Sequence, residues 1–336
     1  MRLFTRKNNS APVFHLRLGA LSGARVLKPE QAGLTELLGR VWSAQTKNIK
    51  EEVMRPRIDS LASSVYSSVR RNTICLAVHG LSEFQMPLAE IFSDILVNYQ
   101  TSAKILEREK KVMLESLRSR KDSPSYIASL NFHKKMFGNH PYAMDLLGNE
   151  ETLNSIKAED VDAFLRQYLR PETMVAEASG DLSRALWADV IEKASENLQP
   201  GAAKVEMVEH PDLKSNDYIF ETAKKEQTHI IYGFKALSLK DKDRFALQII
   251  EAILAGQGGR LFLELRDKAS LAYSVSPMRM EGMETGYFGA YIGCSPEKSE
   301  TAVKMMEVEF AKLMNTPVGD EELQRAKNYL IGGHDI

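Results

Sequence analysis

Apolar side chains recur at helical spacing in some stretches of the chain and alternate with polar ones in others. The clearest helix is predicted at 105–120, where Ile105, Val112, Met113 and Leu117 form one apolar face and charged residues fill the other. Further helices are predicted at 33–44, 49–61, 82–95, 126–137, 158–168, 182–197, 241–255, 260–268, 296–314 and 321–330. Strands are predicted at 12–20, 63–68, 73–78, 174–179, 228–234, 271–280 and 285–294. This mixture is typical of an α+β protein.

The order of these elements repeats within the chain. Two helices, two strands and a helix are predicted in 33–97 and again in 241–314, and the segments 78–81 and 291–294 correspond at an offset of 213 residues. A duplicated α+β unit explains this pattern. Between the copies, Pro200, Gly201 and Pro211 punctuate a stretch without periodicity. We therefore expect a first half-domain at 1–199, a linker at 200–216 and a second half-domain at 217–336.

Composition excludes several classes of protein. The 336 residues are 43% apolar and 26% charged with a net charge of −1, so nothing indicates binding to nucleic acid or to an anionic membrane surface. No apolar run approaches the roughly 20 residues of a membrane span. No apolar stretch follows the basic N-terminal residues, so we expect no signal peptide, and both cytoplasm and periplasm stay open. Cys75 and Cys294 fall in strands of different halves and are expected to be buried free thiols.

The stretch 256–273 concentrates the candidate chemistry. Gly256, Gly258 and Gly259 form a glycine-rich loop, and a predicted helix and strand follow it. Arg266 near the helix end and Tyr273 in the strand are seven residues apart, so both could donate hydrogen bonds to peptide carbonyls from one side. Alternatively, Arg266 pairs with a surface carboxylate and Tyr273 packs in the sheet.

The sequence at 260–275, RLFLELRDKASLAYSV, resembles the C-terminal half-domain of the M16 (pitrilysin-type) metallopeptidase family. The family pattern is a glycine-rich loop followed by RLF-x-x-LR-x-x-x-x-LAYSV. The resemblance implies two homologous half-domains, each a mostly antiparallel sheet with helices on one face, the second incomplete at its C-terminal end here. It also implies that Arg266 and Tyr273 bind substrate backbone opposite a zinc site, with the glycine-rich loop as a rim that touches substrate.

The zinc motif of the family is degenerate in this chain. Active members carry H-x-x-E-H on the first long helix, where two His bind zinc and the Glu activates water. The matching positions hold Glu36, Gly39 and Arg40, so both His and the general base are replaced. A guanidinium stays protonated and cannot bind a metal ion. Glu107 is the best match to the last zinc ligand, and we expect it to pair with Arg40 or to be a solvated charge.

Other catalytic motifs are not found in the sequence. His15, His79, His133, His140 and His229 have no partners at metal-ligand spacing and are expected to be structural. No G-x-S-x-G or G-x-x-x-x-G-K motif occurs. A phosphate-binding role for the glycine-rich loop is disfavoured because a helix, and not a strand, precedes the loop.

Two functional hypotheses follow from the resemblance. The first is a non-catalytic M16B-like subunit that binds peptide backbone and completes the active site of a zinc-bearing M16 partner in a clamshell heterodimer. Zinc is then expected in the partner and no cofactor in this chain, and a homodimer is the alternative assembly. The second is a scaffold or interaction protein of the same fold without a role in proteolysis. A self-sufficient peptidase with an unorthodox site is disfavoured by the charge of Arg40.

Overall fold

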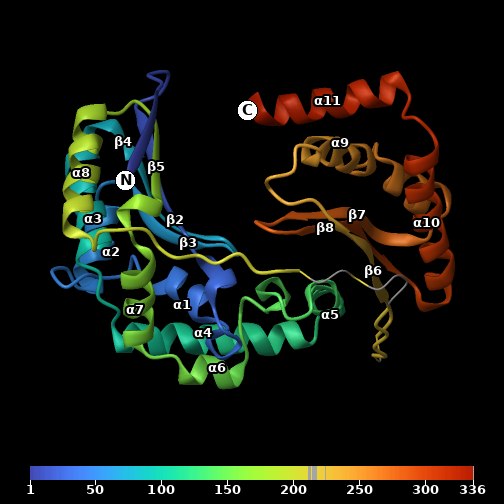
Figure 1. The fold of residues 1–336 in the computed structure, drawn as a ribbon, viewed down its shortest axis with the longest axis horizontal. Helices are drawn as coiled ribbons and strands as arrows, with labels where there is room; N and C mark the ends of the chain where they lie inside the picture. The colour runs from blue at the N-terminus through green and yellow to red at the C-terminus, as the bar shows by residue number, and fades with distance from the viewer. Residues whose placement is uncertain (211–212, 214–217, 224, 336) are drawn as a thin grey trace. The chain divides into compact units, whose positions relative to one another are not determined.

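The chain forms two compact units in a computed structural model that describes residues 1–210, 213, 218–223 and 225–335 (Figure 1). Unit 1 comprises Met1–Arg118 and Met144–Glu206, and unit 2 comprises Ser119–Ala143 and Met207–Ile336. The division expected from the sequence had placed 119–143 in the first half-domain. Of the expected linker at 200–216, residues 200–210 contain no helix or strand, and 211–212 and 214–216 lie outside the described residues.

Unit 1 contains a five-stranded sheet with the strand order β1-β5-β2-β4-β3. The strands are β1 (Arg2–Lys7), β2 (Val13–Leu21), β3 (Ser64–Val69), β4 (Thr73–Leu81) and β5 (Met174–Gly180). All neighbouring pairs are antiparallel except β1 and β5, which run parallel. The sequence patterns had not predicted β1. The helices of this unit are α1 (Leu34–Val41), α2 (Glu51–Asp59), α3 (Gln85–Val97), α4 (Ala103–Lys121), α6 (Glu150–Ser155), α7 (Ala158–Tyr168) and α8 (Arg184–Asn197).

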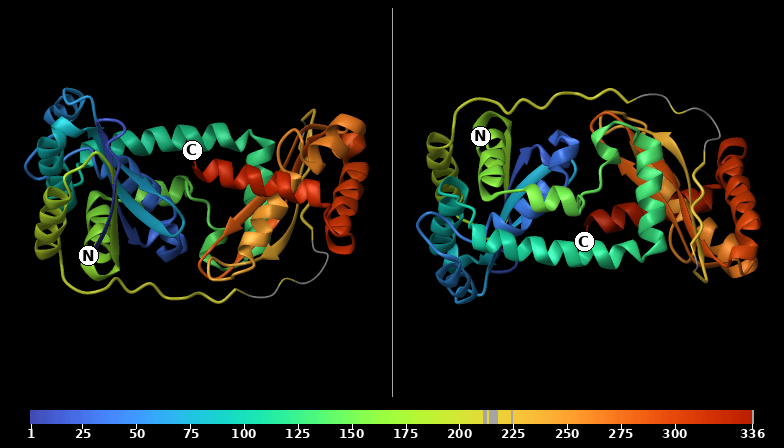
Figure 2. Two further views of the ribbon diagram at one scale, coloured as in Figure 1. Left: turned by 90° about the horizontal axis from the view of Figure 1, so that it is seen from above. Right: turned by 90° about the horizontal axis from the view of Figure 1, so that it is seen from below.

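The core of unit 1 lies between the sheet and its helices. Along β2, Phe14 and the alternating residues after it are buried, as the pleat of a half-buried strand requires. Trp187 of α8 packs against Phe14 and against Phe92 of α3, at ring-centroid distances of 5.4 and 6.0 Å. Figures 1 and 2 show α3 and α8 together on this side of the sheet. The other face of the sheet carries the second set of alternating residues.

Unit 2 contains the antiparallel sheet β6-β8-β7, formed by β6 (Thr228–Ala236), β7 (Ala272–Glu281) and β8 (Gly286–Cys294). Its helices are α5 (Pro124–Phe137), α9 (Arg244–Leu254), the π-helix η6 (Phe262–Lys268), α10 (Ser299–Asn315) and α11 (Asp320–Asp335). On one face of β8, Phe288 and Ile292 pack into a core with Leu265 and Met306. The α11 helix lies alongside α9 (Figure 1).

Residues 119–143 join unit 2 because α5 covers the opposite face of its sheet. Phe132 of α5 meets Tyr287 edge-on at 5.0 Å, and a Cβ on Gly233 of β6 would lie 2.8 Å from the Phe132 ring. The buried Tyr142 hydroxyl accepts a hydrogen bond of 2.8 Å from the Met283 amide. Glycine at 233 is therefore what lets the helix pack close to the strand.

The architecture confirms the α+β fold with a duplicated unit. The strands β2, β4 and β3 of unit 1 and β6, β8 and β7 of unit 2 have the same antiparallel order, with β4 and β8 in the middle. These two strands contain the sequence segments that correspond at the offset of 213 residues. In each unit, two helices precede the last two strands of this set and one follows them.

Candidate functional site

The degenerate motif lies on α1, whose apolar stripe fixes the direction of its polar residues. Leu34, Leu37, Leu38 and Val41 are buried against the core of unit 1. Glu36 and Arg40, one turn apart, therefore share a half-exposed face. Arg40 Nη2 lies 3.6 Å from Glu36 Oε1.

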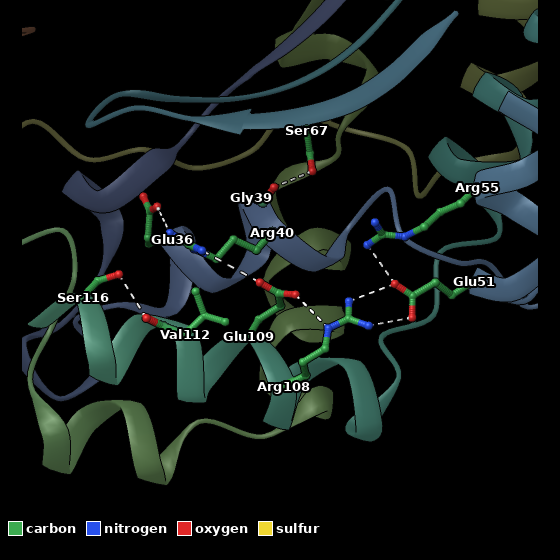
Figure 3. A network of polar contacts seen from close by, with 10 residues as sticks. All are labelled: Glu36, Gly39, Arg40, Glu51, Arg55, Ser67, Arg108, Glu109, Val112 and Ser116. Atoms are coloured by element: carbon green, nitrogen blue, oxygen red, sulfur yellow. Dashed lines mark hydrogen bonds and ion pairs between the residues drawn. The ribbon is translucent and has the colours of Figure 1, made fainter. Parts of the chain in front are cut away.

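Arg40 also contacts the neighbouring helix α4. Its Nη1 lies 3.8 Å from Glu109 Oε2, and the other carboxylate oxygen of Glu109 accepts a hydrogen bond of 3.0 Å from Arg108 Nε (Figure 3). Glu107, the expected counterpart of the last zinc ligand, lies 2.8 Å from Lys110, and its side chain is 62% exposed. Arg40, at the expected ligand position, is therefore paired with Glu36 and Glu109.

Figure 3 shows that this pairing continues as a chain of charges from α1 through α4 to α2. Arg108 donates two hydrogen bonds, of 2.8 and 2.9 Å, to the Glu51 carboxylate, and Arg55 lies 2.8 Å from the same group. The bonds from Arg108 lower the pKa of Glu51. Three guanidiniums alternate with three carboxylates, so their charges cancel. A divalent cation added here would compete with arginines for the same oxygen atoms.

Gly39, at the expected position of the general base, lies against the edge strand β3. Ser67 Oγ donates a hydrogen bond of 2.9 Å to the Gly39 carbonyl oxygen. A Cβ at position 39 would lie 3.0 Å from Val69 Cγ2, closer than ordinary side-chain contacts. A glutamate at this position would have to displace β3 or the valine.

The residues present do not fit a zinc ion. Zinc sites use thiolate, imidazole or carboxylate ligands. Of the three motif positions only Glu36 has such a side chain, and it lies beside the Arg40 cation, whereas Gly39 has no side chain. Within the described ranges, no group of three or more His, Cys, Asp or Glu could hold a metal ion.

The second candidate region begins at the glycine-rich loop, which is anchored to α11. Gly256 has φ = +74°, a conformation that side chains other than glycine rarely adopt. Arg260 forms two hydrogen bonds with Glu322 of α11, and Arg325 of the same helix donates one of 3.2 Å to the Gly258 carbonyl. Arg260 thereby lowers the pKa of Glu322. These contacts fix the start of the segment that carries Arg266.

Arg266 lies on a π-helix, where the sequence had predicted an ordinary helix at 260–268. In this π-helix the Ala269 amide donates to the Glu264 carbonyl, five residues earlier, at 3.2 Å. Arg266 is exposed, and its Cζ lies 4.9 Å from the centroid of the Phe262 ring. The guanidinium thus lies over an aromatic face on an exposed residue.

Tyr273 lies at an irregularity in β7. The pairing register with β8 shifts between Ala272 and Ser274, so Tyr273 occupies a bulge, and the residue is 62% exposed. Within the described part of the chain, neither Tyr273 nor Arg266 forms a hydrogen bond or an ion pair, with each other or with another residue. Ser270, between them, has φ = +50°. Bulges and π-helices of this kind often re-aim side chains at functional sites.

The sequence prediction had missed Glu109 as a partner of Arg40, although the position of Glu109 along the helix indicates that its side chain points inward. Glu109 is four residues from both Ile105 and Met113, which belong to the buried stripe of α4. Its side chain is 16% exposed, against 62% for Glu107. Helical phase therefore identifies Glu109 as the inward carboxylate.

Comparison with protein families matches both parts of the chain. Residues 2–150 match the model of insulinase (peptidase family M16), and residues 155–330 match the model of the peptidase M16 inactive domain. The chain belongs to peptidase family M16. Among the described residues of this M16 chain, no helix is long and apolar enough to span a membrane.

Individual relatives agree with the family assignment. The M16 chain is 23% identical over 312 residues to the uncharacterized zinc protease YmxG of Bacillus subtilis, covering 93% of this chain and 76% of that protein. It is 24% identical to the non-peptidase homolog YmxG of Helicobacter pylori, and this alignment covers 98% of this chain and 77% of that protein. The crystal structure of a peptidase M16 inactive domain from Pseudomonas fluorescens superposes with a TM-score of 0.91 at 23% identity, covering 99% and 82%. Together the comparisons place the chain in the M16 family and show that it has the fold of this family.

Proposed function

We propose that this chain is a non-catalytic M16 subunit that binds the backbone of a peptide and completes the active site of a zinc-bearing M16 partner. In this role Arg266 and Tyr273 donate hydrogen bonds to peptide carbonyls. The glycine-rich loop of Gly256, Gly258 and Gly259 forms the rim beside them. The two subunits close around the peptide, and the metal that activates water belongs to the partner.

The observation that carries the proposal is the contrast between the two candidate regions. At the zinc position, Arg40 is paired with Glu36 and Glu109 in a network without net charge. At the other region, Arg266 and Tyr273 are exposed and keep their hydrogen-bond donors available. A subunit that had kept only a structural role would have no use for two exposed donors on irregular backbone.

Backbone recognition fits the types of these residues. Main-chain carbonyls are present in every peptide, so an arginine and a tyrosine that bind them select extended chains more than particular side chains. Selectivity would then come from the length and extension of the peptide. The ring of Phe262 limits the freedom of Arg266 before the peptide arrives, which lowers the entropic cost of binding.

The test combines the purified chain with a zinc-bearing M16 partner. We expect the chain alone to contain less than one zinc per molecule and to cleave no peptide. The mixture should cleave, and Arg266→Ala and Tyr273→Phe should each lower kcat/KM about tenfold or more, as expected when a hydrogen bond to substrate is lost.

Arg184→Ala and Tyr218→Phe are matched controls, because both residues are exposed and lie outside the 256–273 stretch. They should leave the activity of the mixture unchanged. If Arg266→Ala and Tyr273→Phe also leave it unchanged, the chain is a scaffold of the M16 fold. One zinc per chain together with chelator-sensitive cleavage by the chain alone would also contradict the proposal, because the chain would then be a zinc peptidase itself.

A further inference from the structure

One face of the unit 1 sheet collects basic side chains. Along β2, Phe14 and Leu16 point to the helices, so His15 and Arg17 point to the other face. The strand register places His15 opposite His79 of β4, and Arg17 opposite Glu177 of β5. The rings of His79 and Tyr66 of β3 meet edge-on at 6.4 Å, which places Tyr66 on the same face.

The first strand adds two more arginines to this face. In β1, Leu3 packs against the core, so Arg2, Phe4 and Arg6 alternate outward and are exposed. The register pairs Phe4 with Glu177, beside Arg17. We call Arg2, Phe4, Arg6, His15, Arg17 and His79 the basic sheet face.

Among the described residues, the arginines of the basic sheet face have no ion-pair partner. Arg2, Arg6 and Arg17 form no hydrogen bond or ion pair with another described residue. Glu177 is the one carboxylate that the strand registers place among them, so the face carries an excess of positive charge although the whole chain has a net charge of −1. Burial lowers the pKa of His15, and the nearby charges of Arg17 and His79 lower it further, as expected where positive charges gather.

The face also offers exposed apolar surface between its charges. Phe4 is 58% exposed and Tyr66 is 38% exposed. An extended polypeptide across the strands could place carboxylates against the guanidiniums and apolar side chains against these rings. Arginine suits this role because its planar fork of donors matches a carboxylate.

We propose that the basic sheet face binds acidic segments of the polypeptide substrate. The inference rests on the proposed function and deepens it by naming a substrate class. Arg266 and Tyr273 hold the peptide backbone without regard to sequence, whereas Arg2, Arg6 and Arg17 favour chains rich in Asp and Glu. Electrostatic attraction of this kind mainly raises the association rate and weakens with salt.

The test measures direct binding to the full chain, without a catalytic partner. Labelled peptides of equal length, one rich in Glu and Ser and one rich in Gln and Ser, are titrated with the protein and followed by fluorescence anisotropy. We expect about tenfold tighter binding of the Glu-rich peptide at low salt, and a smaller difference at about 0.3 M salt. The double variant R6Q/R17Q should weaken binding of the Glu-rich peptide about five- to tenfold.

The control double variant K111Q/R184Q removes the same charge from exposed helix positions outside the sheet. It should change the affinity less than about twofold, because distant charges are screened. Equal binding of the two peptides, or an equal loss in both double variants, would overturn the inference. So would tighter binding of a single-stranded oligonucleotide of the same length, which would indicate a nucleic-acid surface.

The experiments can refute the proposed function and the further inference independently of each other. If the Glu-rich peptide binds as expected but Arg266→Ala has no effect in the mixture with a partner, the proposed function fails and the basic sheet face stands as a binding surface. If Arg266→Ala abolishes cleavage but the mixture shows no preference for acidic peptides, only the further inference fails.

Discussion

The guanidinium of Arg40 lies 3.8 Å from the carboxylate of Glu109 and thereby connects α1 to α4 beside the zinc position that the family motif led us to expect. On the other side, Arg40 lies 3.6 Å from Glu36. Removing a metal ion from a site lined by carboxylates would leave like charges close together. The guanidinium of Arg40, a cation supplied by the chain itself, offsets this repulsion without a metal.

We expect Arg40→Gln to lower the free energy of unfolding by about 0–1 kcal/mol, because the side chain is 30% exposed and water screens its ion pairs. Glu109 keeps its hydrogen bond from Arg108, which limits the loss. Urea unfolding of the wild type, Arg40→Gln, Glu109→Gln and the double variant gives the coupling energy. The coupling should shrink at high salt. Strict additivity of the two substitutions at low salt would show that the contact contributes nothing.

Position 39 should not tolerate glutamate, the general base of the H-x-x-E-H motif. Gly39→Glu introduces a Cβ that would lie 3.0 Å from Val69 Cγ2, and crowding of this kind costs about 1–3 kcal/mol. The better helix propensity of Glu returns less than about 1 kcal/mol. We therefore expect a lower Tm for Gly39→Glu and partial recovery in Gly39→Glu/Val69→Ala. If Val69→Ala gives no recovery, packing against β3 is not the reason for glycine at this position.

Much of the fold could be predicted from sequence because its elements have strong periodicity. The apolar stripe of α4 (Ala103–Lys121) and the paired strands β7 and β8 lie where the patterns placed them. The internal repeat indicated the duplicated α+β unit for the same reason. The short strand β1 was not predicted because only Leu3 and Thr5 face the core, which gives too brief an alternation to recognise.

Tertiary contacts decided the features that the sequence could not indicate. Residues 119–143 belong to unit 2 because Phe132 meets Tyr287 and the Tyr142 hydroxyl accepts from Met283, both far away in the chain. The π-helix at 262–268 has no distinct sequence period. The Arg/Tyr positions were found from a motif, whereas their irregular backbone required coordinates. The helical phase of α4 favours Glu109 over Glu107 as the inward carboxylate, but its contact with Arg40 also depends on where α1 lies.

Acid should weaken the fold through His15. Burial, together with Arg17 and His79, lowers the pKa of His15 below its ordinary 6.5. The unfolded chain therefore binds more protons than the folded chain below about pH 6.5, so the free energy of unfolding falls as the pH drops through the folded pKa. Urea unfolding between pH 7.5 and 5 measures this slope. His15→Gln should reduce it in the window just below pH 6.5.

Below about pH 4.5, other groups determine how the free energy of unfolding depends on pH, and this range serves as an internal control. Glu51 and Glu322 have lowered pKa values because Arg108 and Arg260 hydrogen-bond to them. Their contribution is present above about pH 4.5 and is lost as the pH falls further. His15→Gln should leave that acidic part of the profile unchanged. A profile that His15→Gln does not alter between pH 6.5 and 5 would contradict the assignment.

Phe262 should act on peptide binding through Arg266. Its ring lies 4.9 Å from the Arg266 guanidinium, one turn earlier on the π-helix. Phe262→Leu keeps an apolar side chain but removes the aromatic face, and a cation–π contact at an exposed site is worth about 0.5–1 kcal/mol. We therefore expect peptide affinity of the mixture with a zinc-bearing partner to fall about two- to fivefold, less than in Arg266→Ala.

The chain offers a matched control for this effect. Arg244 lies 4.5 Å from the ring of Phe245 on α9, outside the 256–273 stretch. Phe245→Leu removes the same type of contact and should leave peptide affinity unchanged. Equal losses in both leucine variants would point to a general effect on unit 2. If the ring acts by holding the arginine, peptide affinity should fall in Phe262→Leu but not in Phe245→Leu. In the Arg266→Ala background, Phe262→Leu should then cause no further loss of affinity, because both substitutions remove the same interaction.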